Sequence, residues 1–346
     1  EVMEGNFQNK RILFLSVKLF NYENIIADKL RSLGAIVDYY DERPANSIFA
    51  KGIIRLNREF YKKKIINYYN AILNDIKYKK YDYFFLIKGE VVSQFFIDKI
   101  KELNPEMVTL YYTFDSFVNN PNGIKVLDSF ERKFTFDCKD SEKYNISFRP
   151  LFFSDDYRNV SVESCPKIDL LFIGTAHSDR YVISEALSNW CKTNNLKTVA
   201  FYYSPSRLVF LFFKFFDPSF KRFDYKKISF KSLNHNQIID LYKKTKVILD
   251  INHPNQNGLT MRVFEALGSG KKLITTNSDI KRYPFYNTNN VFVIDRYNIV
   301  VEKSFFDKPF IKIDEKLYNQ MSIDGFLKEL FFSKDINKWL DMNYNN

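Results

Sequence analysis

Compact apolar runs alternate along the first half of the chain with stretches whose apolar residues recur at helical spacing. The apolar runs lie at 11–16, 35–40, 81–89, 107–114, 133–138 and 146–153. The helical stretches between them include 48–79 and 92–103. Near-continuous apolar strands that alternate with helices are typical of a parallel sheet covered on both faces. The segment 1–153 therefore predicts one doubly wound, Rossmann-like α/β domain.

The same alternation restarts after a polar, turn-rich segment at 154–167, which we interpret as a linker. Strands are predicted at 168–176, 197–203, 246–252, 272–276 and 290–295. Helices between these strands are predicted at 179–193, 235–245 and 260–267. The second half thus predicts another Rossmann-like domain over 168–321, followed by a helical tail over 322–346.

The composition points to an anionic partner for a folded protein. The 346 residues carry a net charge of +11, with 45% hydrophobic residues, 36 Phe and 23 Tyr. Such a balance fits nucleic acid, anionic lipid or phosphorylated small molecules, and it excludes disorder as the default. Three dispersed cysteines (Cys138, Cys165 and Cys191) and only three histidines predict no metal site and a reducing compartment.

No segment of the sequence predicts membrane insertion. The most apolar run, 208–216, has nine residues and includes Lys214, whereas a spanning helix needs about 20. The start of the chain has no apolar stretch typical of a signal peptide. We therefore expect a cytoplasmic protein.

Ligands of open α/β sheets bind beyond the carboxyl ends of the strands. In the second half these ends are Gly174-Thr175, Asp250 to His253, and Thr275 to Asn277. In the first half they are Ser16 to Lys18, Lys88 to Glu90, and Asp115-Ser116. Two such domains facing one another would bring both sets to a single cleft.

The segment Gly268-Ser269-Gly270-Lys271-Lys272 looks at first like a P-loop, which requires G-x-x-x-x-G-K-[ST] between a strand and the following helix. Here the residue five before Gly270 is Glu265, and a lysine replaces the hydroxyl residue. The glycines also follow a helix and precede a strand. They predict a helix C-cap, and the chain is not expected to be a P-loop NTPase.

The other end of that helix is a better anion site. Turn-forming residues continue up to Gly258, so the backbone N–H groups of Gly258, Leu259 and Thr260 are free to bind a diphosphate. Arg262 and Glu265 are three residues apart and share a helix face. The guanidinium suits phosphate, and the carboxylate suits vicinal sugar hydroxyls. The alternative is a surface ion pair without a function.

The segment 241–277 (LYKKTKVILDINHPNQNGLTMRVFEALGSGKKLITTN) resembles the donor-domain signature of group 1 glycosyltransferases, closest to the CgeB-like branch. The segment 168–180 resembles the strand and glycine turn that open this domain, and 148–157 resembles the entry to the interdomain hinge. The resemblance covers most of 146–295. The N-terminal half is similar only in architecture.

The resemblance implies a GT-B fold: two Rossmann-like domains facing a central cleft, with a nucleotide-sugar held by the C-terminal one. It implies that Glu265 binds the nucleotide ribose, that Arg262 binds the diphosphate, and that the Gly174 turn lies near the phosphates together with Thr175 and Arg180. It also implies a metal-independent, hexosyltransferase-type reaction without a cofactor.

The donor is expected to be a UDP-sugar by default, with a GDP- or dTDP-sugar as the alternatives. Asn257 stands where many retaining members carry a glutamate, so a retaining outcome is not implied.

Glycosyl transfer requires stabilisation of a departing nucleoside diphosphate and, for inversion, a base for the acceptor hydroxyl. His253, Lys18 and Arg180 are candidates for leaving-group stabilisation besides Arg262. Asp115 is the first candidate base and Glu90 the second. The alternative for Asp115 is a helix N-cap, and His253 and His177 have the alternative of ordinary polar loop residues.

The segment 204–223 mixes a Phe/Leu block with basic residues. One interpretation is an interfacial segment that holds the protein against an anionic membrane, at the inner face of the cell membrane. The other interpretation, which the short proline-bounded helix favours, is a core helix with a basic exposed end.

The sequence predicts a glycosyltransferase acting on a glycan or lipid-linked acceptor in the synthesis of a surface polysaccharide such as capsule or O-antigen. A nucleic-acid-binding protein is the main alternative, because charge and aromatic content suit it, although the basic residues are scattered and no known module appears. Nucleic acid is therefore not an expected partner. A GT-B-fold sugar-nucleotide epimerase or a non-catalytic homologue is the other alternative.

Overall fold

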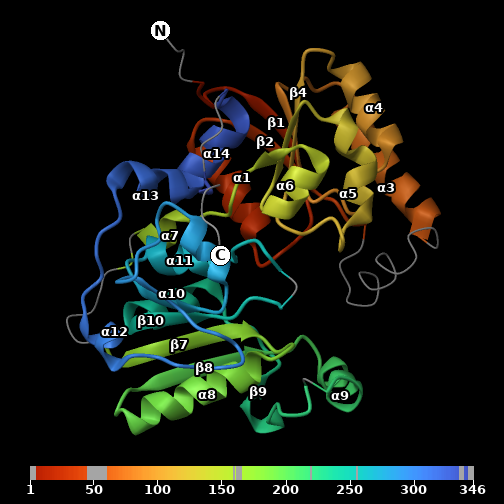
Figure 1. Ribbon diagram of the computed structural model, residues 1–346. Helices are drawn as coiled ribbons and strands as arrows, with labels where there is room; N and C mark the ends of the chain where they lie inside the picture. Colours follow the sequence, from red (N-terminus) through yellow and green to blue (C-terminus); the bar gives the residue numbers. More distant parts are fainter. Residues whose placement is uncertain are drawn as a thin grey trace. The chain divides into compact units, whose positions relative to one another are not determined.

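The chain divides into two compact units in the computed structural model, which describes residues 5–44, 61–158, 160, 166–218, 220–254, 256–334 and 339–341 (Figure 1). The first unit comprises residues 1–150 and 323–338. The second comprises 151–322 and 339–346. Part of the C-terminal tail thus belongs to the first unit: the chain returns to it at residue 323 and goes back to the second unit at residue 339.

The first unit contains a six-stranded sheet in the order β2-β1-β3-β4-β5-β6, and all its neighbouring strands are parallel. Its strands are β1 (Arg11–Ser16), β2 (Ile36–Asp41), β3 (Tyr83–Ile87), β4 (Val108–Thr113), β5 (Arg132–Thr135) and β6 (Ser147–Phe148). The central strands β1, β3 and β4 are almost wholly buried. This burial explains their near-continuous apolar sequence.

Helices flank this sheet, and the longer ones bury an apolar stripe. They are α1 (Tyr22–Ser32), α3 (Lys62–Ile76), α4 (Gln94–Leu103), α5 (Pro121–Val126), α6 (Cys138–Tyr144) and α14 (Ile323–Phe332). In α3 the buried residues are Ile65, Tyr69, Ile72 and Ile76, spaced so that they line one face. The predicted helical stretch 48–79 therefore contains α3, while its part up to residue 60 lies outside the described residues.

The second unit also contains a six-stranded parallel sheet, in the order β12-β11-β10-β7-β8-β9. Its strands are β7 (Ile168–Thr175), β8 (Thr198–Tyr203), β9 (Ile228–Ser229), β10 (Thr245–Asp250), β11 (Lys272–Thr275) and β12 (Val291–Val293). Its helices are α7 (Asp155–Arg158), α8 (Arg180–Thr193), α9 (Arg207–Phe216), α10 (His235–Lys243), α11 (Met261–Gly268), α12 (Lys303–Asp307) and α13 (Glu315–Met321).

The glycine-lysine segment after α11 is a helix stop, as predicted. Gly270 has a φ of 68°, in the left-handed region that glycine adopts without strain. The backbone N–H of Gly270 donates to Leu267 O, and that of Lys271 donates to Ala266 O. Lys272 is buried, and its ammonium group donates to the carbonyls of Phe305 and Lys308. The backbone of Gly270 and Lys271 therefore closes the helix, the Lys272 side chain binds the 305–308 segment, and the glycine-lysine segment does not form a phosphate loop.

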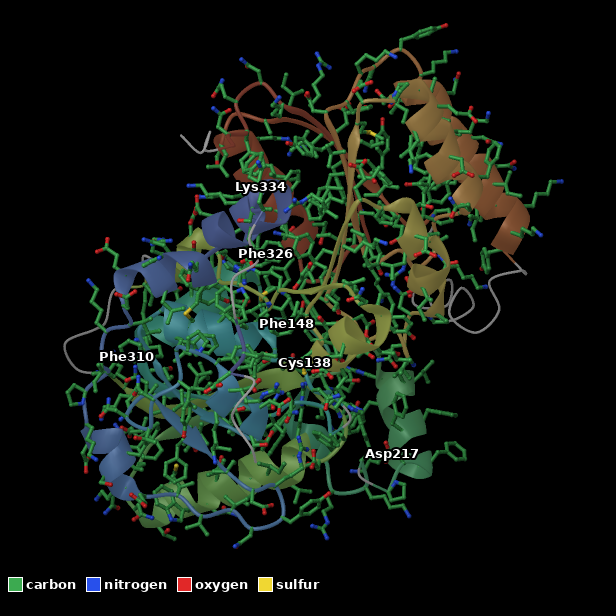
Figure 2. The ribbon with its side chains drawn as sticks, turned by 45° about the horizontal axis from the view of Figure 1, so that its top comes forward. Cys138, Phe148, Asp217, Phe310, Phe326 and Lys334 are labelled. Carbon is green, nitrogen blue, oxygen red and sulfur yellow. The ribbon has the colours of Figure 1, made fainter. Side chains whose placement is uncertain are left out.

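The C-terminal helix α14 completes the core of the first unit. Glu329 and Arg149 are 2% and 0% exposed, and Glu329 Oε2 lies 2.7 Å from Arg149 Nε. Phe326, which Figure 2 labels, packs edge-on against Tyr112 with ring centroids 4.9 Å apart. Arg132 donates to the carbonyl of Leu330 at 2.6 Å. The last turns of a helix far along the sequence are therefore bound to β4, β5 and the end of β6.

The helical tail is shorter than predicted. Helix α14 ends at Phe332, and the described residues after it (333, 334 and 339–341) are not helical. The remaining tail positions lie outside the described residues. Among the helices that the structure describes, none has the length and apolar character needed to cross a membrane.

Removal of the Glu329 carboxylate should destabilise the first unit, because it would leave the Arg149 cation buried without its counter-charge. Glu329→Ala is expected to lower the free energy of unfolding by about 3 kcal/mol. Urea denaturation followed by circular dichroism measures this loss. Glu102→Ala is the matched control, since its ion pair with Lys99 is exposed and should contribute less than about 1 kcal/mol. A loss no larger than that of the control would contradict the role of the pair.

Candidate functional site

The strand order of the second unit reverses between β7 and β10, and ligands of doubly wound sheets bind at the carboxyl ends of such a strand pair. Gly174 and Thr175 end β7, and Asp250 ends β10. A Cβ added to Gly174 would lie 2.6 Å from the Phe172 ring and 3.3 Å from Arg180 Nη1. The chain therefore requires glycine at this point for its close packing.

The carboxylate of Asp250 binds the start of α11. It is buried and accepts hydrogen bonds from the hydroxyls of Thr260, at 2.6 Å, and Thr275, at 2.9 Å. Thr260 is the N-cap residue of α11; its hydroxyl donates to Asp250, and its side chain makes no capping hydrogen bond. The side chain of the N-cap residue therefore does not satisfy an N–H group of the first turn.

Arg262 and Glu265 form an ion pair on the first turns of α11, and this pair is not on the surface. Arg262 Nη1 and Glu265 Oε2 are 3.0 Å apart, and the two side chains are 21% and 6% exposed. Arg262 also donates to the hydroxyl of Tyr242 at 3.1 Å and to Ile173 O at 3.4 Å. Burial opposes the charge of Arg262, but the neighbouring Tyr242 and Glu265 raise its pKa above the ordinary value. The guanidinium therefore stays charged at the carboxyl end of β7.

Arg180 joins the ends of the two central strands. Its Nε donates to Ile251 O at 3.0 Å, and its Nη1 donates to Thr175 O at 3.1 Å. Burial lowers the pKa of Arg180 to about 10, with Asp250 acting in the opposite direction. A second cation is thus fixed beside the start of α11, still protonated at neutral pH.

The two predicted histidines lie together on the loops after β7 and β10. The ring centroids of His177 and His253 are 5.5 Å apart. Burial, together with the charges of Arg180 and His253, lowers the pKa of His177 to about 3, so this imidazole is neutral. His253 is exposed. The structure therefore brings the two histidines together at the carboxyl ends of β7 and β10.

The loop before α11 holds the remaining predicted donor-binding residues. Leu259 is 1% exposed, so its side chain anchors the loop in the core while its backbone leads into the helix. Gly258 O accepts from the Gln256 side chain at 3.4 Å and from the Asn277 side chain at 3.5 Å. The backbone of Gly258 is thereby bound to the segment that follows β11.

Arg296 is a residue of this site that sequence reasoning did not identify. Its Nη1 donates to both carboxylate oxygens of Asp179, at 2.7 and 2.6 Å. Its Nη2 donates to Asn252 O at 2.6 Å and to Thr276 Oγ1 at 3.2 Å. The sequence pattern could have identified Arg296 as a candidate, because it follows the predicted strand 290–295 and so lies at the carboxyl end of a strand.

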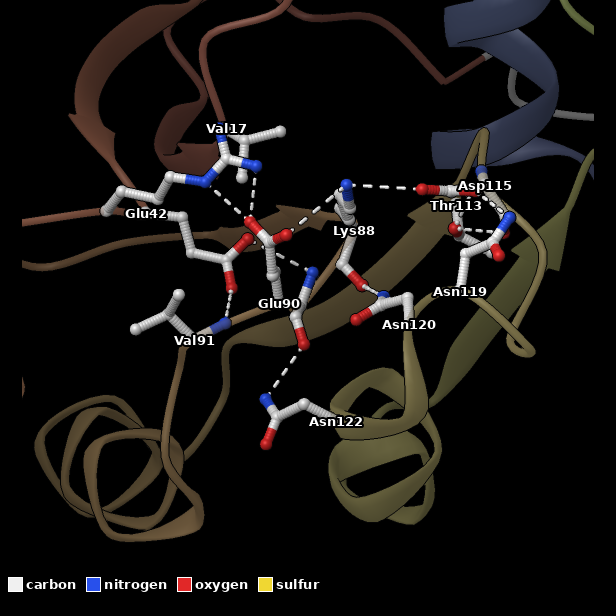
Figure 3. Close-up of polar contacts among 12 residues, drawn as sticks. Val17, Glu42, Lys88, Glu90, Val91, Thr113, Asp115, Asn119, Asn120 and Asn122 are labelled. Carbon is white, nitrogen blue, oxygen red and sulfur yellow. Dashed lines mark hydrogen bonds and ion pairs between the residues drawn. The ribbon is translucent and has the colours of Figure 1, made fainter. Parts of the chain in front are cut away.

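The first unit has a charged cluster of its own at the carboxyl ends of β2, β3 and β4, shown in Figure 3. Lys88 and Gly89 follow β3 with φ values of 83° and 70°, both in the left-handed region. Lys88 O accepts from the hydroxyl of Tyr111 at 2.7 Å and from the Asn120 side chain. Asn122 donates to Gly89 O at 2.8 Å. Side chains of the next segment thus hold this turn in shape.

The two candidate bases, Glu90 and Asp115, have different surroundings in this cluster. Glu90 is 8% exposed; its Oε2 accepts from Arg43 Nε at 2.5 Å, and its Oε1 lies 3.6 Å from Lys88 Nζ. Asp115 is 29% exposed and lies 3.2 Å from the same ammonium group. It also accepts from the Asn119 side chain at 3.3 Å. Lys88 therefore contacts both carboxylates, and Asp115 is the more accessible one.

The N-cap interpretation of Asp115 is wrong. Helix α5 begins at Pro121 with Asn120 in the N-cap position, and a turn without a helix follows Asp115. Lys18, the other predicted cation of this half, is 55% exposed, and its Nζ lies 4.0 Å from an oxygen of Asp41. It is thus a surface group after β1.

Glu42 is a buried acid of the same cluster. It is 0% exposed and accepts from the backbone N–H groups of Val91 at 2.6 Å, Val92 at 3.1 Å and Gly89 at 3.1 Å. Burial raises the pKa of Glu42 to about 7, although the bonds from Val91 and Val92 act in the opposite direction. Its carboxyl group thus connects the end of β2 to the turn after β3.

No family model and no curated protein matches the sequence. Solved structures are similar over nearly the whole chain. An alpha-glucosyltransferase in complex with UDP and a 13-mer DNA is 13% identical, with a TM-score of 0.56 over 93% of this chain and 95% of its own. Anabaena HepE in complex with UDP-glucose is 10% identical, with a TM-score of 0.52 over 93% and 99%.

This likeness agrees with the two six-stranded parallel sheets. The chain has the GT-B fold. The predicted fold class is therefore confirmed: each GT-B unit is a doubly wound Rossmann-like domain, and α14 is the C-terminal helix.

The raised pKa of Glu42 predicts a pH dependence of the stability of this GT-B protein. Between pH 4.5, the ordinary pKa of this carboxyl group, and about pH 7, Glu42 is protonated in the folded state and ionised in the unfolded state. Protonation therefore stabilises the folded state, and this stabilisation is complete below pH 4.5 and is lost as the pH rises through 7. The loss is on the order of 3 kcal/mol. Glu42→Gln should remove this dependence. Free energies of unfolding of both proteins from pH 5 to 8 test it, and a difference that does not change with pH would contradict it.

Proposed function

We propose that the protein is a glycosyltransferase that moves a sugar from a nucleotide-sugar donor to an acceptor hydroxyl. The observation that carries this proposal is the start of α11 in a GT-B fold. There, an uncapped helix N-terminus, Arg262 and the buried carboxylate of Glu265 meet at the carboxyl ends of the two switch-point strands. These groups suit two parts of a nucleoside diphosphate: the cationic groups suit the diphosphate, and the carboxylate suits the ribose hydroxyls.

The diphosphate would bind at the backbone N–H groups of 258–260, where the partial positive charge of the helix N-terminus favours an anion. Arg262 and Arg180 would supply charge-assisted hydrogen bonds. Both are already fixed by contacts to strand ends, so binding would order few side chains. Glu265 would accept from the ribose hydroxyls, and the Gly174–Thr175 turn would border the phosphates.

We propose UDP as the nucleotide, because the two solved structures described above contain it, one as UDP and one as UDP-glucose. GDP and dTDP remain the alternatives. In the same proposal the transferred group is a hexose, no metal takes part, and the chain belongs near the CgeB-like branch of group 1 glycosyltransferases.

For the transfer step, the helix N-terminus, Arg262 and Arg180 would stabilise the charge that develops on the leaving diphosphate. His253 is a further candidate for this role. Asp115 is the proposed base for the acceptor hydroxyl. Glu90 is the weaker candidate, because cations contact both of its oxygens and it is nearly buried.

The proposed acceptor is a glycan or a lipid-linked glycan of a surface polysaccharide such as capsule or O-antigen. Nucleic acid is the second candidate, favoured by the net charge of +11 and by the similar alpha-glucosyltransferase that was solved with UDP and DNA. A gel shift with duplex DNA and RNA at two salt concentrations tests nucleic acid as the acceptor. If neither nucleic acid binds, the glycan remains the proposed acceptor.

Arg262→Ala and Glu265→Ala should each lower the affinity for the donor nucleotide by at least about tenfold, because each removes a charged partner of the diphosphate or ribose. A thermal-shift screen with UDP, GDP, dTDP, ADP and CMP identifies the nucleotide, and calorimetry then measures the affinities. Arg222→Ala, at an exposed position of the same unit, is the matched control. Circular dichroism confirms the fold of each variant. Unchanged affinity for every nucleotide would refute the site.

Asp115→Asn should lower kcat by about 100-fold or more while leaving the affinity for the donor nucleotide unchanged, because the amide cannot accept the proton of the acceptor hydroxyl. Steady-state transfer assays with the nucleotide found in the screen measure kcat. Asp128→Asn is the control, since that carboxylate is fully exposed. Full activity of the Asp115 variant would move the role of base to another residue.

A further inference from the structure

Helix α9 presents an apolar face to solvent. Figure 1 shows it as a separate helix at the edge of the second unit, after β8, and Figure 2 labels Asp217, where it ends. Only Phe210 of its ten residues is buried. The exposed apolar residues are Leu208 (79%), Leu211 (38%), Phe212 (58%), Phe213 (42%), Phe215 (74%) and Phe216 (73%). The core-helix interpretation of this segment is therefore wrong.

The spacing of these residues makes a continuous stripe. Positions 208, 211, 212, 215 and 216 recur at three and four residues, which places them along one side of a helix. Phe212 and Phe216 contact each other, with ring centroids 4.8 Å apart. A contiguous exposed apolar surface of this kind marks an interaction site.

The opposite side of α9 is anchored to the unit, which fixes the direction of the stripe. Phe210 packs against Phe220 and Phe230, with ring centroids 5.7 and 6.2 Å apart. Lys214 donates to Phe223 O from the same side. Because the inner face is held by these contacts, the outer face cannot turn inward without breaking them.

Basic residues lie close to the stripe in the sequence. Segment 207–231 contains seven Lys and Arg residues against two Asp. Lys221, Arg222 and Lys226, in the loop after α9, are all exposed. Lysine is depleted in protein–protein interfaces, whereas lysine and arginine beside exposed Phe and Leu are typical of helices that lie in the headgroup region of anionic membranes. The charge therefore favours a lipid surface over a second protein.

We propose that α9, together with the exposed side chains of Lys221, Arg222 and Lys226, forms a docking surface for an anionic lipid bilayer. A helix of ten residues is about 15 Å long, too short to span, so it would lie in the plane of the membrane with Phe212, Phe215 and Phe216 inserted among the acyl chains. The basic loop would contact the phosphate groups of the lipids. This inference is independent of the proposed sugar transfer, because it uses none of the donor-site residues.

Vesicle cosedimentation of the full chain tests the surface. Phosphatidylcholine vesicles containing about 30% phosphatidylglycerol should bind the protein at least about tenfold more strongly than pure phosphatidylcholine vesicles, and added salt should weaken the binding. Phe212→Ser/Phe215→Ser should lower the bound fraction about tenfold. Lys221→Glu/Arg222→Glu should abolish the preference for the anionic lipid.

Tyr297→Ser/Val300→Ser is the matched control, since these apolar side chains of the same unit are 93% and 61% exposed and lie outside α9. It should bind vesicles like the wild type. Equal binding to both vesicle types, no binding, or unchanged binding of the α9 variant would overturn the proposal. Light scattering that shows dimers lost in the Phe212/Phe215 variant, without vesicle binding, would also overturn it by assigning the stripe to a second copy of the chain.

Discussion

The carboxylate of Asp250 holds three segments of the second unit in one place. It stands at the end of β10, takes the hydroxyl of Thr260 from the start of α11, and takes the hydroxyl of Thr275 from the end of β11. Thr260 is the N-cap residue of α11, and its side chain makes no capping hydrogen bond. The negative charge also lies close enough to Arg180 to support its protonated form. One buried acid therefore sets the position of the helix N-terminus and supports a cation beside it.

Sequence reasoning succeeded where local pattern decides structure. The strands 168–175 and 11–16 are near-continuous apolar runs, which is the pattern expected of strands in a parallel sheet covered on both faces. Glycine after α11 indicated the helix stop because only glycine adopts a positive φ there without strain. The placement of Arg262 beside Glu265 followed from helical spacing alone.

It failed where a contact joins residues far apart. Arg149 and Glu329 form an ion pair although they are 180 residues apart in the sequence. The sequence around either residue does not indicate its partner. The pair is one of several contacts that bind α14 to the first unit. Arg296 illustrates the same limit, since its partner Asp179 precedes it by 117 residues. For α9 the apolar pattern was read correctly, but pattern alone does not say whether another element covers it.

The turn at Lys88 and Gly89 has a consequence for any molecule that reaches that edge of the first unit. A lysine in the left-handed region is strained by about 1 kcal/mol or more, and it persists because neighbouring side chains determine its backbone. Tyr111, Asn120 and Asn122 hold the carbonyls of this turn, and Glu42 holds its N–H groups. The backbone of this turn is already ordered in the free protein, so binding of a ligand there would cost little conformational entropy of the backbone. The rigidity of the turn favours selection by shape over adaptation to many different ligands.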